Sequence, residues 1–306
     1  MEIDKIYNMD CLEGMKQIPD GSIDAIICDL PYGTMKGIDD RHDWDEIIPS
    51  APLFEQYERV LRRSGVAILF SQEPYTSHLR TFKPRNMDFL YPLIWLKDSA
   101  GNAMSAKTAP ISYFEDINVF AKRHDSQLLH PLRDYFSQVL NYCGGKKIVI
   151  SEIGGRADHV FRSESSQFAL CTKETYGLLI SHFGIDKMEG FHPYEYLEDI
   201  NRTFNRTFNR TFNLPDGKAS KSNVLQYAKD TDGFHPTQKP VALIADLIRT
   251  YTNEGDTILD NCMGSGTTAV ACIKEKRHFI GFELNKEYYD KACLRIDAVK
   301  RQLTLF

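Results

Sequence analysis

The 306-residue sequence lacks paired cysteines: its seven cysteines stand apart, with no CxxC pair and no histidine at metal-ligand spacing. This pattern excludes a disulfide framework and a zinc site, and it predicts reduced, mostly buried thiols in a cytoplasmic protein. No apolar run is long enough to cross a bilayer. The segment Met1–Lys5 also lacks the pattern of a signal peptide. The composition therefore excludes membrane-spanning and secreted classes and gives no indication of a bound metal.

Positive charge is not in excess either, since 37 Lys and Arg stand against 42 Asp and Glu, a formal net charge of −5. Neutralisation of phosphates supplies most non-specific affinity for nucleic acid, so a nucleic-acid partner requires a local basic patch. What is present is ordinary for a globular protein, with 42% hydrophobic and 26% charged residues. The length suffices for one large α/β domain and a smaller module.

Short apolar runs alternate with helical patterns in the first 124 residues and again in residues 231–306. The runs predicted to be buried strands are Ser22–Cys28, Val66–Phe70, Phe89–Leu96, Asp116–Ala121, Thr257–Leu259 and His278–Phe282. The segments predicted to be helices are Phe54–Arg63, Pro240–Tyr251, Thr267–Lys276 and Lys286–Arg301. Strands that alternate with helices favour crossover connections and a parallel sheet. The two flanking blocks, 1–124 and 231–306, are thus predicted to form one α/β domain.

The middle of the chain, residues 125–230, shows no buried-strand run and is predicted to be a mainly helical inserted region. Its helix-like segments are Leu132–Tyr142, Lys146–Ile153, Arg156–Phe161, Lys173–Phe183 and Tyr194–Ile200. Gly154 and Gly155 separate two of these segments. The pattern fits a helix-turn-helix motif or simply a pair of short helices.

A tandem repeat follows, in which the sequence NRTF occurs three times over Asn201–Phe212. A four-residue step on a helix would place the arginines along one face and the phenylalanines along another. Basic side chains interleaved with aromatic rings suit nucleic acid, because guanidinium groups meet phosphates and rings meet bases. A solvated arm without a partner is the other interpretation. The candidate DNA-binding residues are Arg202, Arg206, Arg210, Lys218 and Lys221.

The first candidate catalytic motif, Asp29-Leu30-Pro31-Tyr32, directly follows the strand Ser22–Cys28. Ligands of α/β sheets bind beyond the carboxyl ends of strands. An exocyclic amine of a base is a poor nucleophile, and two acceptors that hold its N–H bonds stabilise the positive charge of the transition state. The Asp29 carboxylate and the Leu30 carbonyl, the latter aimed by Pro31, can supply these acceptors. The Tyr32 ring can stack on the base.

The second motif, Asp260-Asn261-Cys262-Met263-Gly264-Ser265-Gly266-Thr267-Thr268, joins a predicted strand to a helix. Glycines at such a turn let a ligand approach the backbone and the helix N-terminus. The loop has neither GxGxxG nor a Walker lysine, which excludes a dinucleotide or triphosphate pattern. Glu283 ends the next strand, where a carboxylate holds ribose hydroxyls. A nucleoside ligand without phosphate is predicted, and S-adenosylmethionine fits.

The order of these motifs resembles that of the β class of DNA amino-methyltransferases. The tetrapeptide D/N/S-P-P-Y of that family is matched with Leu30 in place of the first proline. The family's loop D-P-F-x-G-S-G-T-T is matched with Asn261 and Cys262 substituted. Asn8–Leu12 resembles the segment whose aspartate contacts the adenine of the cofactor, and His235–Pro240 resembles the segment beside its methionine end. Phe279–Glu283 resembles the ribose-binding segment.

The resemblance implies a Rossmann-like, S-adenosylmethionine-dependent methyltransferase with a mostly parallel sheet and an inserted target-recognition region. It implies transfer to the N6 amine of an adenine flipped out of double-stranded DNA, since Asp at the first motif position favours adenine and Ser favours N4-cytosine. The catalytic residues would be Asp29, Leu30, Pro31 and Tyr32. The cofactor-binding residues would be Asp10, Cys11, Thr237, Lys239, Asp260, Asn261, Cys262, Gly264, Ser265, Gly266, Thr267 and Glu283.

Other interpretations stay open on the sequence. They are an RNA or protein amine methyltransferase with the same pocket and a DNA-binding regulator with an inactive cofactor site. The resemblance allows a prokaryotic or phage protein, a homodimer and a cognate restriction endonuclease, for which the sequence has no signature. Glu115-Asp116, before a predicted strand, is interpreted as a solvated turn.

Overall fold

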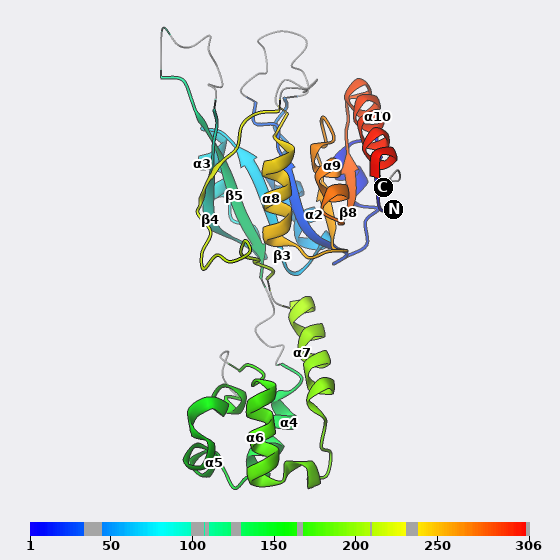
Figure 1. The fold of residues 1–306 in the computed structure, drawn as a ribbon. Coiled ribbons are helices and arrows are strands. Elements are labelled where there is room, and N and C mark those ends of the chain that lie inside the picture. The colour runs from blue at the N-terminus through cyan, green and yellow to red at the C-terminus, as the bar shows by residue number, and fades with distance from the viewer. Residues whose placement is uncertain are drawn as a thin grey trace. The chain divides into compact units, whose positions relative to one another are not determined.

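The protein is described by a computed structural model over residues 1–33, 45–98, 107, 110–123, 130–163, 168–208, 210–230 and 238–303, without the side chains of 205–208 and 303. The chain forms two compact units. Unit 1 comprises Met1–Arg123 and Arg210–Phe306, and unit 2 comprises His124–Asn209 (Figure 1).

Unit 1 is built on one sheet, which in the described part of the chain has eight strands in the order β1-β8-β7-β2-β3-β5-β4-β6. Its neighbouring strands pair in parallel except at β5, which is antiparallel to both β3 and β4. The strands are β1 (Lys5–Tyr7), β2 (Ile23–Asp29), β3 (Leu61–Ser71), β4 (Met87–Leu96), β5 (Phe114–Lys122), β6 (Val224–Gln226), β7 (Thr257–Asp260) and β8 (His278–Phe282). The predicted mostly parallel α/β fold is confirmed.

Helices cover both faces of this sheet, and successive residues of a strand pack on opposite faces. In β2, Ile27 contributes to the core under α8 (Val241–Tyr251), α9 (Thr267–Lys274) and α10 (Lys286–Leu303). Ile26 and Cys28 contribute to the core under α1 (Cys11–Met15), α2 (Ser50–Val60) and α3 (Tyr75–Thr81). Figure 1 shows α8 and α9 on one face of the sheet and α2 on the other. No helix in the described ranges is long and apolar enough to cross a membrane.

The reversed strand β5 differs from the parallel pairing predicted for this stretch. Six residue pairs, from Val66–Ala121 to Ser71–Asp116, define its antiparallel register with β3. A strand buried on both faces loses the alternation of polar and apolar residues, so its sequence does not reveal its direction. As a consequence, β5 begins at the edge where the parallel strands end.

Unit 2 is helical and has its own core, which includes Phe136, Val139, Tyr176, Leu179 and Leu197. Its elements are α4 (Arg133–Tyr142), α5 (Lys146–Ile153), α6 (Lys173–Phe183), α7 (Tyr194–Phe208) and 3-10 turns at Gly154–Ala157, His159–Phe161 and Ile185–Lys187. After Gly154 and Gly155 the chain makes 3-10 turns, so a second α-helix of a helix-turn-helix does not form there. Gly154 leaves α5 with a φ of 73°, which ends the helix.

Residues 210–230, predicted to lie in the inserted region, belong to unit 1 instead. Asn213 ties this segment to the end of α8, because its backbone N–H donates to Thr250 O (2.7 Å) and its side chain to Arg249 O (2.9 Å). β6 then pairs with β4 at the sheet edge. A three-residue edge strand buries a single side chain, Leu225, and is too short to produce a recognisable pattern.

The three NRTF repeats do not form one helix, which is the condition under which their arginines would stack along one face. α7 ends at Phe208, and the described residues of the third repeat lie in neither a helix nor a strand. In the first repeat Phe204 packs on His130 of unit 2, with ring centroids 4.2 Å apart. In the third repeat Phe212 packs on Tyr251 of unit 1 at 5.8 Å. Different neighbours thus give identical sequences different structures.

We expect Gly14→Ala to destabilise unit 1, because a Cβ at this position of α1 would lie 2.3 Å from Cε1 of the buried Phe282 ring. Overpacking of this kind lowers the free energy of unfolding by about 1–3 kcal/mol. Trp44 and Trp95, the two tryptophans of the chain, both belong to unit 1, so urea denaturation followed by tryptophan fluorescence measures it alone. Gly177→Ala in α6 of unit 2, with no atom within 4 Å of the added Cβ, is the control and should leave this transition unchanged.

Candidate active site

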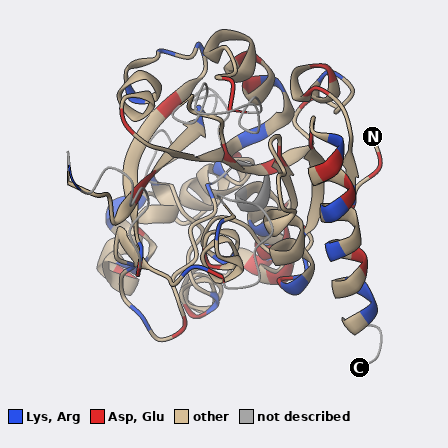
Figure 2. Ribbon diagram, turned by 90° about the horizontal axis from the view of Figure 1, so that it is seen from above, with Lys and Arg blue, Asp and Glu red and all other residues tan. Residues whose placement is uncertain are grey.

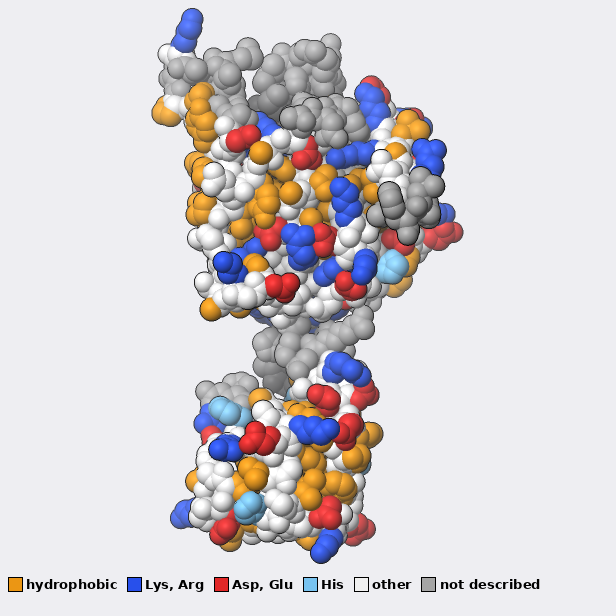
Figure 3. Space-filling view, viewed as in Figure 1, with side chains coloured by type: hydrophobic (Ala, Val, Ile, Leu, Met, Phe, Trp, Pro, Cys, Tyr) orange, Lys and Arg blue, Asp and Glu red, His pale blue; other side chains and the backbone are white. Residues whose placement is uncertain are grey.

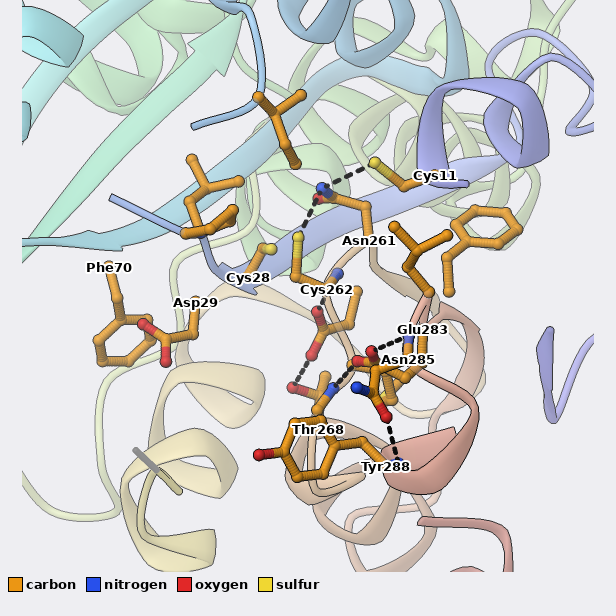
Figure 4. A pocket seen from close by; sticks show the side chains of 18 of the residues that line it. Cys11, Cys28, Asp29, Phe70, Asn261, Cys262, Thr268, Glu283, Asn285 and Tyr288 are labelled. Atoms are coloured by element: carbon orange, nitrogen blue, oxygen red, sulfur yellow. Dashed lines mark hydrogen bonds between the residues drawn. The ribbon is translucent and has the colours of Figure 1, made fainter. Parts of the chain in front are cut away.

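A cavity of about 590 Å³ lies at the carboxyl edge of the sheet in unit 1 (Figure 4). Residues that follow β1, β2, β7 and β8 line it, as expected for the carboxyl ends of parallel strands. The predicted site residues that line it are Asp10, Cys11, Asp29, Leu30, Pro31, Tyr32, Lys239, Asp260, Asn261, Cys262, Gly264, Ser265, Thr267 and Glu283. In Figure 4, Asp29 and Phe70 lie on one side, and Glu283, Asn285 and Tyr288 on the other.

Two predicted residues stand apart from this lining. Gly266 precedes α9 with a φ of 77°, and a Cβ there would lie 3.2 Å from Cβ of Ala292. Its position therefore requires both left-handed backbone and close helix packing. Thr237 lies outside the described residues.

The tetrapeptide Asp29–Tyr32 begins at the last residue of β2 and continues into the segment that follows it. The Leu30 side chain is buried, which fixes the backbone beside Asp29. The next residue is Gly33, whose N–H donates to Oδ1 of the buried Asp45 (3.0 Å). Burial also raises the pKa of the Tyr32 hydroxyl well above its usual value, so the ring is neutral. The motif thus presents a carboxylate and an aromatic ring on a constrained backbone.

The Asp29 carboxylate is held by Lys239, whose ammonium donates to Oδ2. Oδ1 is buried and has no hydrogen-bond partner among the described residues, so the carboxylate keeps unused acceptor capacity. Burial raises the pKa of Asp29 above its usual range, while the charge of Lys239 opposes this change. An acceptor at a cavity wall is the chemistry that an N–H donor requires.

Lys239 also pairs with Glu115, at 3.2 Å from Nζ to Oε2, and Glu115 Oε1 pairs with Lys97 at 2.5 Å. The side chains of Lys97, Glu115 and Lys239 are at most 8% exposed. Burial opposes the charge on Lys239, but the Asp29 and Glu115 carboxylates outweigh it and raise the pKa of Lys239. The interpretation of Glu115 as part of a solvated turn was wrong, because β5 is reversed and begins at the buried edge. Asp29, Lys239, Glu115 and Lys97 are called the charged row below.

The loop after β7 is organised by Asp260. Its Oδ1 accepts from the N–H of Cys262 (3.1 Å), and its Oδ2 accepts from Oγ1 of Thr268 (2.6 Å). Burial raises the pKa of Asp260 to about 6, and these hydrogen bonds counteract part of that effect. The Asp260 side chain therefore holds both ends of the glycine turn by hydrogen bonds.

Glu283 directly follows β8, lines the cavity and contacts the same glycine turn. Its Oε2 accepts from the N–H of Gly264 (2.7 Å), and its Oε1 accepts from the N–H of Asn285 (2.8 Å). Burial raises the pKa of this carboxyl group. Each oxygen retains a lone pair, so Glu283 can accept further hydrogen bonds from hydroxyl groups in the cavity.

The residues that depart from the family pattern form a polar contact of their own. The Tyr57 hydroxyl donates to Asn261 Oδ1 at 2.6 Å, and both residues are buried. Asn261 Nδ2 faces the sulfurs of Cys262 (3.4 Å) and Cys11 (3.8 Å). A hydrogen bond between Cys262 and Cys11, together with burial, raises the pKa of the Cys11 thiol. Asn261 is thus held by side-chain contacts where the family pattern has proline.

Asp10 caps α1, since its Oδ1 accepts from the N–H groups of Leu12 (2.9 Å) and Glu13 (3.1 Å). Among the described residues no group of three His, Cys, Asp or Glu side chains could hold a metal ion. The sequence did not identify Phe70, Asp45 and Tyr288, which also line the cavity. No local motif marks them, because each reaches the site through the fold.

The predicted DNA-binding residues are divided between the units. Arg202 lies on α7 of unit 2 and pairs with Asp199, and the side chain of Arg206 lies outside the described residues. Arg210, Lys218 and Lys221 belong to unit 1. Lys221 is buried in an ion pair with Asp246 at 2.6 Å, so its charge is not presented at the surface. Basic and acidic side chains are interspersed on the faces shown in Figure 3 and along α10 in Figure 2.

Comparison with known proteins agrees with this geometry. The sequence model of a family described as DNA methylase matches residues 23–293, which is most of the chain. The chain belongs to this family.

A curated relative, the DNA adenine methyltransferase YhdJ of Escherichia coli (strain K12), is 28% identical over 97% of this chain and 83% of its own length. Among solved structures, a complex of M1.HpyAVI with SAM has a TM-score of 0.56 and 17% identity, over 95% of this chain and 98% of that chain. The cytosine-N4-specific PvuII DNA methyltransferase has a TM-score of 0.52 and 13% identity, over 95% and 85%. These structures share the fold of the DNA methylase described here.

We expect Tyr57→Phe to lower the stability of unit 1, because it leaves Asn261 Oδ1 buried without its donor. A buried acceptor without a partner costs about 1–3 kcal/mol in the free energy of unfolding. Urea denaturation followed by tryptophan fluorescence measures this loss. Tyr7→Phe removes an exposed hydroxyl that donates to Glu2 O, and it should cost no more than about 0.5 kcal/mol. Equal losses in the two variants would contradict the role of the Tyr57–Asn261 contact.

Proposed function

We propose that this DNA methylase transfers a methyl group from S-adenosylmethionine to the exocyclic N6 amine of adenine in double-stranded DNA. One observation carries the proposal: a carboxylate with unused acceptor capacity, Asp29, lies across one cavity from a glycine turn bounded by a second carboxylate, Glu283. The Asp29 carboxylate can accept a hydrogen bond from an amine, and the Glu283 carboxylate can accept hydrogen bonds from the ribose hydroxyls of a nucleoside.

The residues of the cavity fit the cofactor. Glu283 has lone pairs for ribose hydroxyls, and the turn Gly264–Gly266 lets a ligand approach the backbone. Asp10 and Cys11 belong to the segment that resembles the adenine-contacting one, and they line the same cavity as Asn261 and Cys262. Lys239 and Thr237 belong to the segment assigned to its methionine end. When bound, S-adenosylmethionine supplies an electrophilic methyl group on its sulfonium.

The protein contributes position and electrostatics to the reaction. Asp29 and the Leu30 carbonyl each accept one N–H of the target amine, and Tyr32 stacks on the base. The amine nitrogen forms a bond to the methyl carbon as the carbon–sulfur bond breaks, and the electron pair of that bond stays on sulfur. The nitrogen then loses one proton to Asp29 or to water. Both thiols near the motif, Cys28 and Cys262, have a raised pKa, so neither is used as a nucleophile.

The base must leave the duplex to reach this cavity, at a cost of a few kcal/mol. We assign target recognition to unit 2 and to the basic residues Arg202, Arg206, Arg210 and Lys218, which bind phosphates. Lys221 is omitted because Asp246 already neutralises it inside unit 1. Two features support adenine as the target: aspartate at the first motif position and the adenine specificity named for the Escherichia coli relative.

We expect Asp29→Ala to reduce methyl transfer to DNA by at least about 10²–10³-fold, because the positive amine nitrogen loses its carboxylate. Tritium transferred from labelled S-adenosylmethionine into duplex DNA measures the rate. Asp29→Asn should show a similar loss while it keeps the shape of the side chain. Calorimetry with S-adenosylhomocysteine should show nearly unchanged affinity for both variants. Asp88→Asn, in an exposed ion pair with Arg123, is the control, and an undiminished rate in Asp29→Ala contradicts the assignment.

We expect the DNA of cells that express this chain to contain N6-methyladenine. Mass spectrometry of the digested nucleosides identifies the modified base, and cells that express Asp29→Ala serve as the control. N4-methylcytosine in its place would overturn the choice of adenine. Label in RNA or protein, with none in DNA, would overturn the proposal as a whole.

A further inference from the structure

The charged row joins four elements that are far apart in the sequence. Asp29 ends β2, Lys97 follows β4, Glu115 is the second residue of β5, and Lys239 precedes α8. The reversed direction of β5 makes the row possible, because Glu115 pairs in register with Trp95 and thereby lies beside the end of β4. A backbone hydrogen bond from Lys97 N–H to Tyr113 O (2.8 Å) fixes this corner.

We infer that Lys239, Glu115 and Lys97 are positioning residues for methyl transfer. Lys239 holds the Asp29 carboxylate by one oxygen, Glu115 holds Lys239, and Lys97 holds Glu115. The row fixes the orientation of Asp29 and sets the electrostatic potential that it experiences. This inference rests on the proposed function of Asp29 as the acceptor for the target amine.

The signs of the four charges explain why Lys239 alone could not hold Asp29 and also preserve its negative potential. Lys239 beside Asp29 alone would cancel the carboxylate charge that faces the sulfonium and the developing positive charge on the amine. Glu115 restores that negative potential, since it contacts the same ammonium. Lys239 and Lys97 together lower the pKa of Glu115 against the effect of burial and keep it ionised. Two cations and two anions then alternate, so that the buried row has no net charge.

A purely structural role and a positioning role differ in pH dependence. Asp29 also faces Cys28, Tyr32 and Asp260, with Asp45 behind Tyr32, but Lys239 and Glu115 act on it most strongly among the charged groups, and with opposite signs. The charge of Lys239 lowers the pKa of Asp29 and that of Glu115 raises it. Removal of Glu115 should therefore lower the pKa of Asp29, and removal of Lys239 should raise it.

The test compares the full-length variants Glu115→Gln and Lys239→Met with the wild-type chain. The first readout is the titration of the Asp29 carboxyl carbon by NMR with ¹³C-labelled aspartate, assigned with Asp29→Asn. The second is the pH profile of single-turnover methyl transfer to DNA. We expect the midpoint to fall by about 1 pH unit in Glu115→Gln and to rise by about 1–3 units in Lys239→Met. The acid limb of the rate profile should move in the same directions.

Two further variants serve as controls. Lys97→Met/Glu115→Gln removes one cation and one anion together, so Lys97 is not left buried without its carboxylate. It should give a downward change that is smaller than in Glu115→Gln, because the charge of Lys97 also lowers the pKa of Asp29, though less than Glu115 raises it. Asp88→Asn, which removes a carboxylate from an exposed ion pair of β4, should leave the Asp29 titration unchanged.

Midpoints that stay at the wild-type value, or move in the same direction in both single variants, overturn the inference. Opposite movements of the carboxyl titration support it, whether or not DNA is the substrate, because that readout requires no methyl transfer. Failure of the wild-type chain to methylate DNA overturns the proposed function instead, so the two results are distinguishable.

Discussion

The parallel pairing of β2, β7 and β8 is the constraint on which the site depends. Parallel neighbours end at the same edge of a sheet, so Asp29, Asp260 and Glu283 meet although more than two hundred residues separate the first from the others. The cavity between them exists because loops, and not helices, continue each strand. Inserting unit 2 between the two halves of unit 1 does not disturb this pairing, since unit 2 packs around its own core.

The buried charged side chains at the carboxyl edge of the sheet are stabilised by ion pairs. Burial by itself would neutralise the Asp29 carboxylate, and Lys239 alone would remove its negative potential. Because the charges of the row alternate, the Asp29 carboxylate can stay ionised although it is buried. Asp260 at the same edge differs, because it accepts hydrogen bonds from an N–H and a hydroxyl group and forms no ion pair with the described residues. Two aspartates that end neighbouring strands and line the same cavity therefore differ, since Asp29 is paired with a lysine and Asp260 is hydrogen-bonded to the loop that follows it.

The substitutions in the glycine turn are accompanied by local contacts. Asn261 stands where the family pattern has proline, and its amide is held by the Tyr57 hydroxyl from α2. Cys262 stands where that pattern has phenylalanine, and it packs with Cys11 and Cys28 in the core beneath the cavity. A rigid ring and a large aromatic side chain are thus replaced by a buried hydrogen bond and small thiols.

Local sequence patterns were enough to predict much of the secondary structure and many residues of the cavity. Apolar runs and helical spacing gave most of the strands and helices, though not β1, α1 or α3, because backbone preference and burial act over a few neighbours. Motif order gave many of the residues that line the cavity. The direction of β5, the edge strand β6, the placement of residues 210–230 and the burial of Glu115 depended on tertiary structure. A doubly buried strand looks the same in either direction, and identical NRTF repeats adopt different structures beside different neighbours. The sequence names many of the groups that line the cavity, while only packing across the sheet decides which charges meet, because their energies depend on partners distant in the chain.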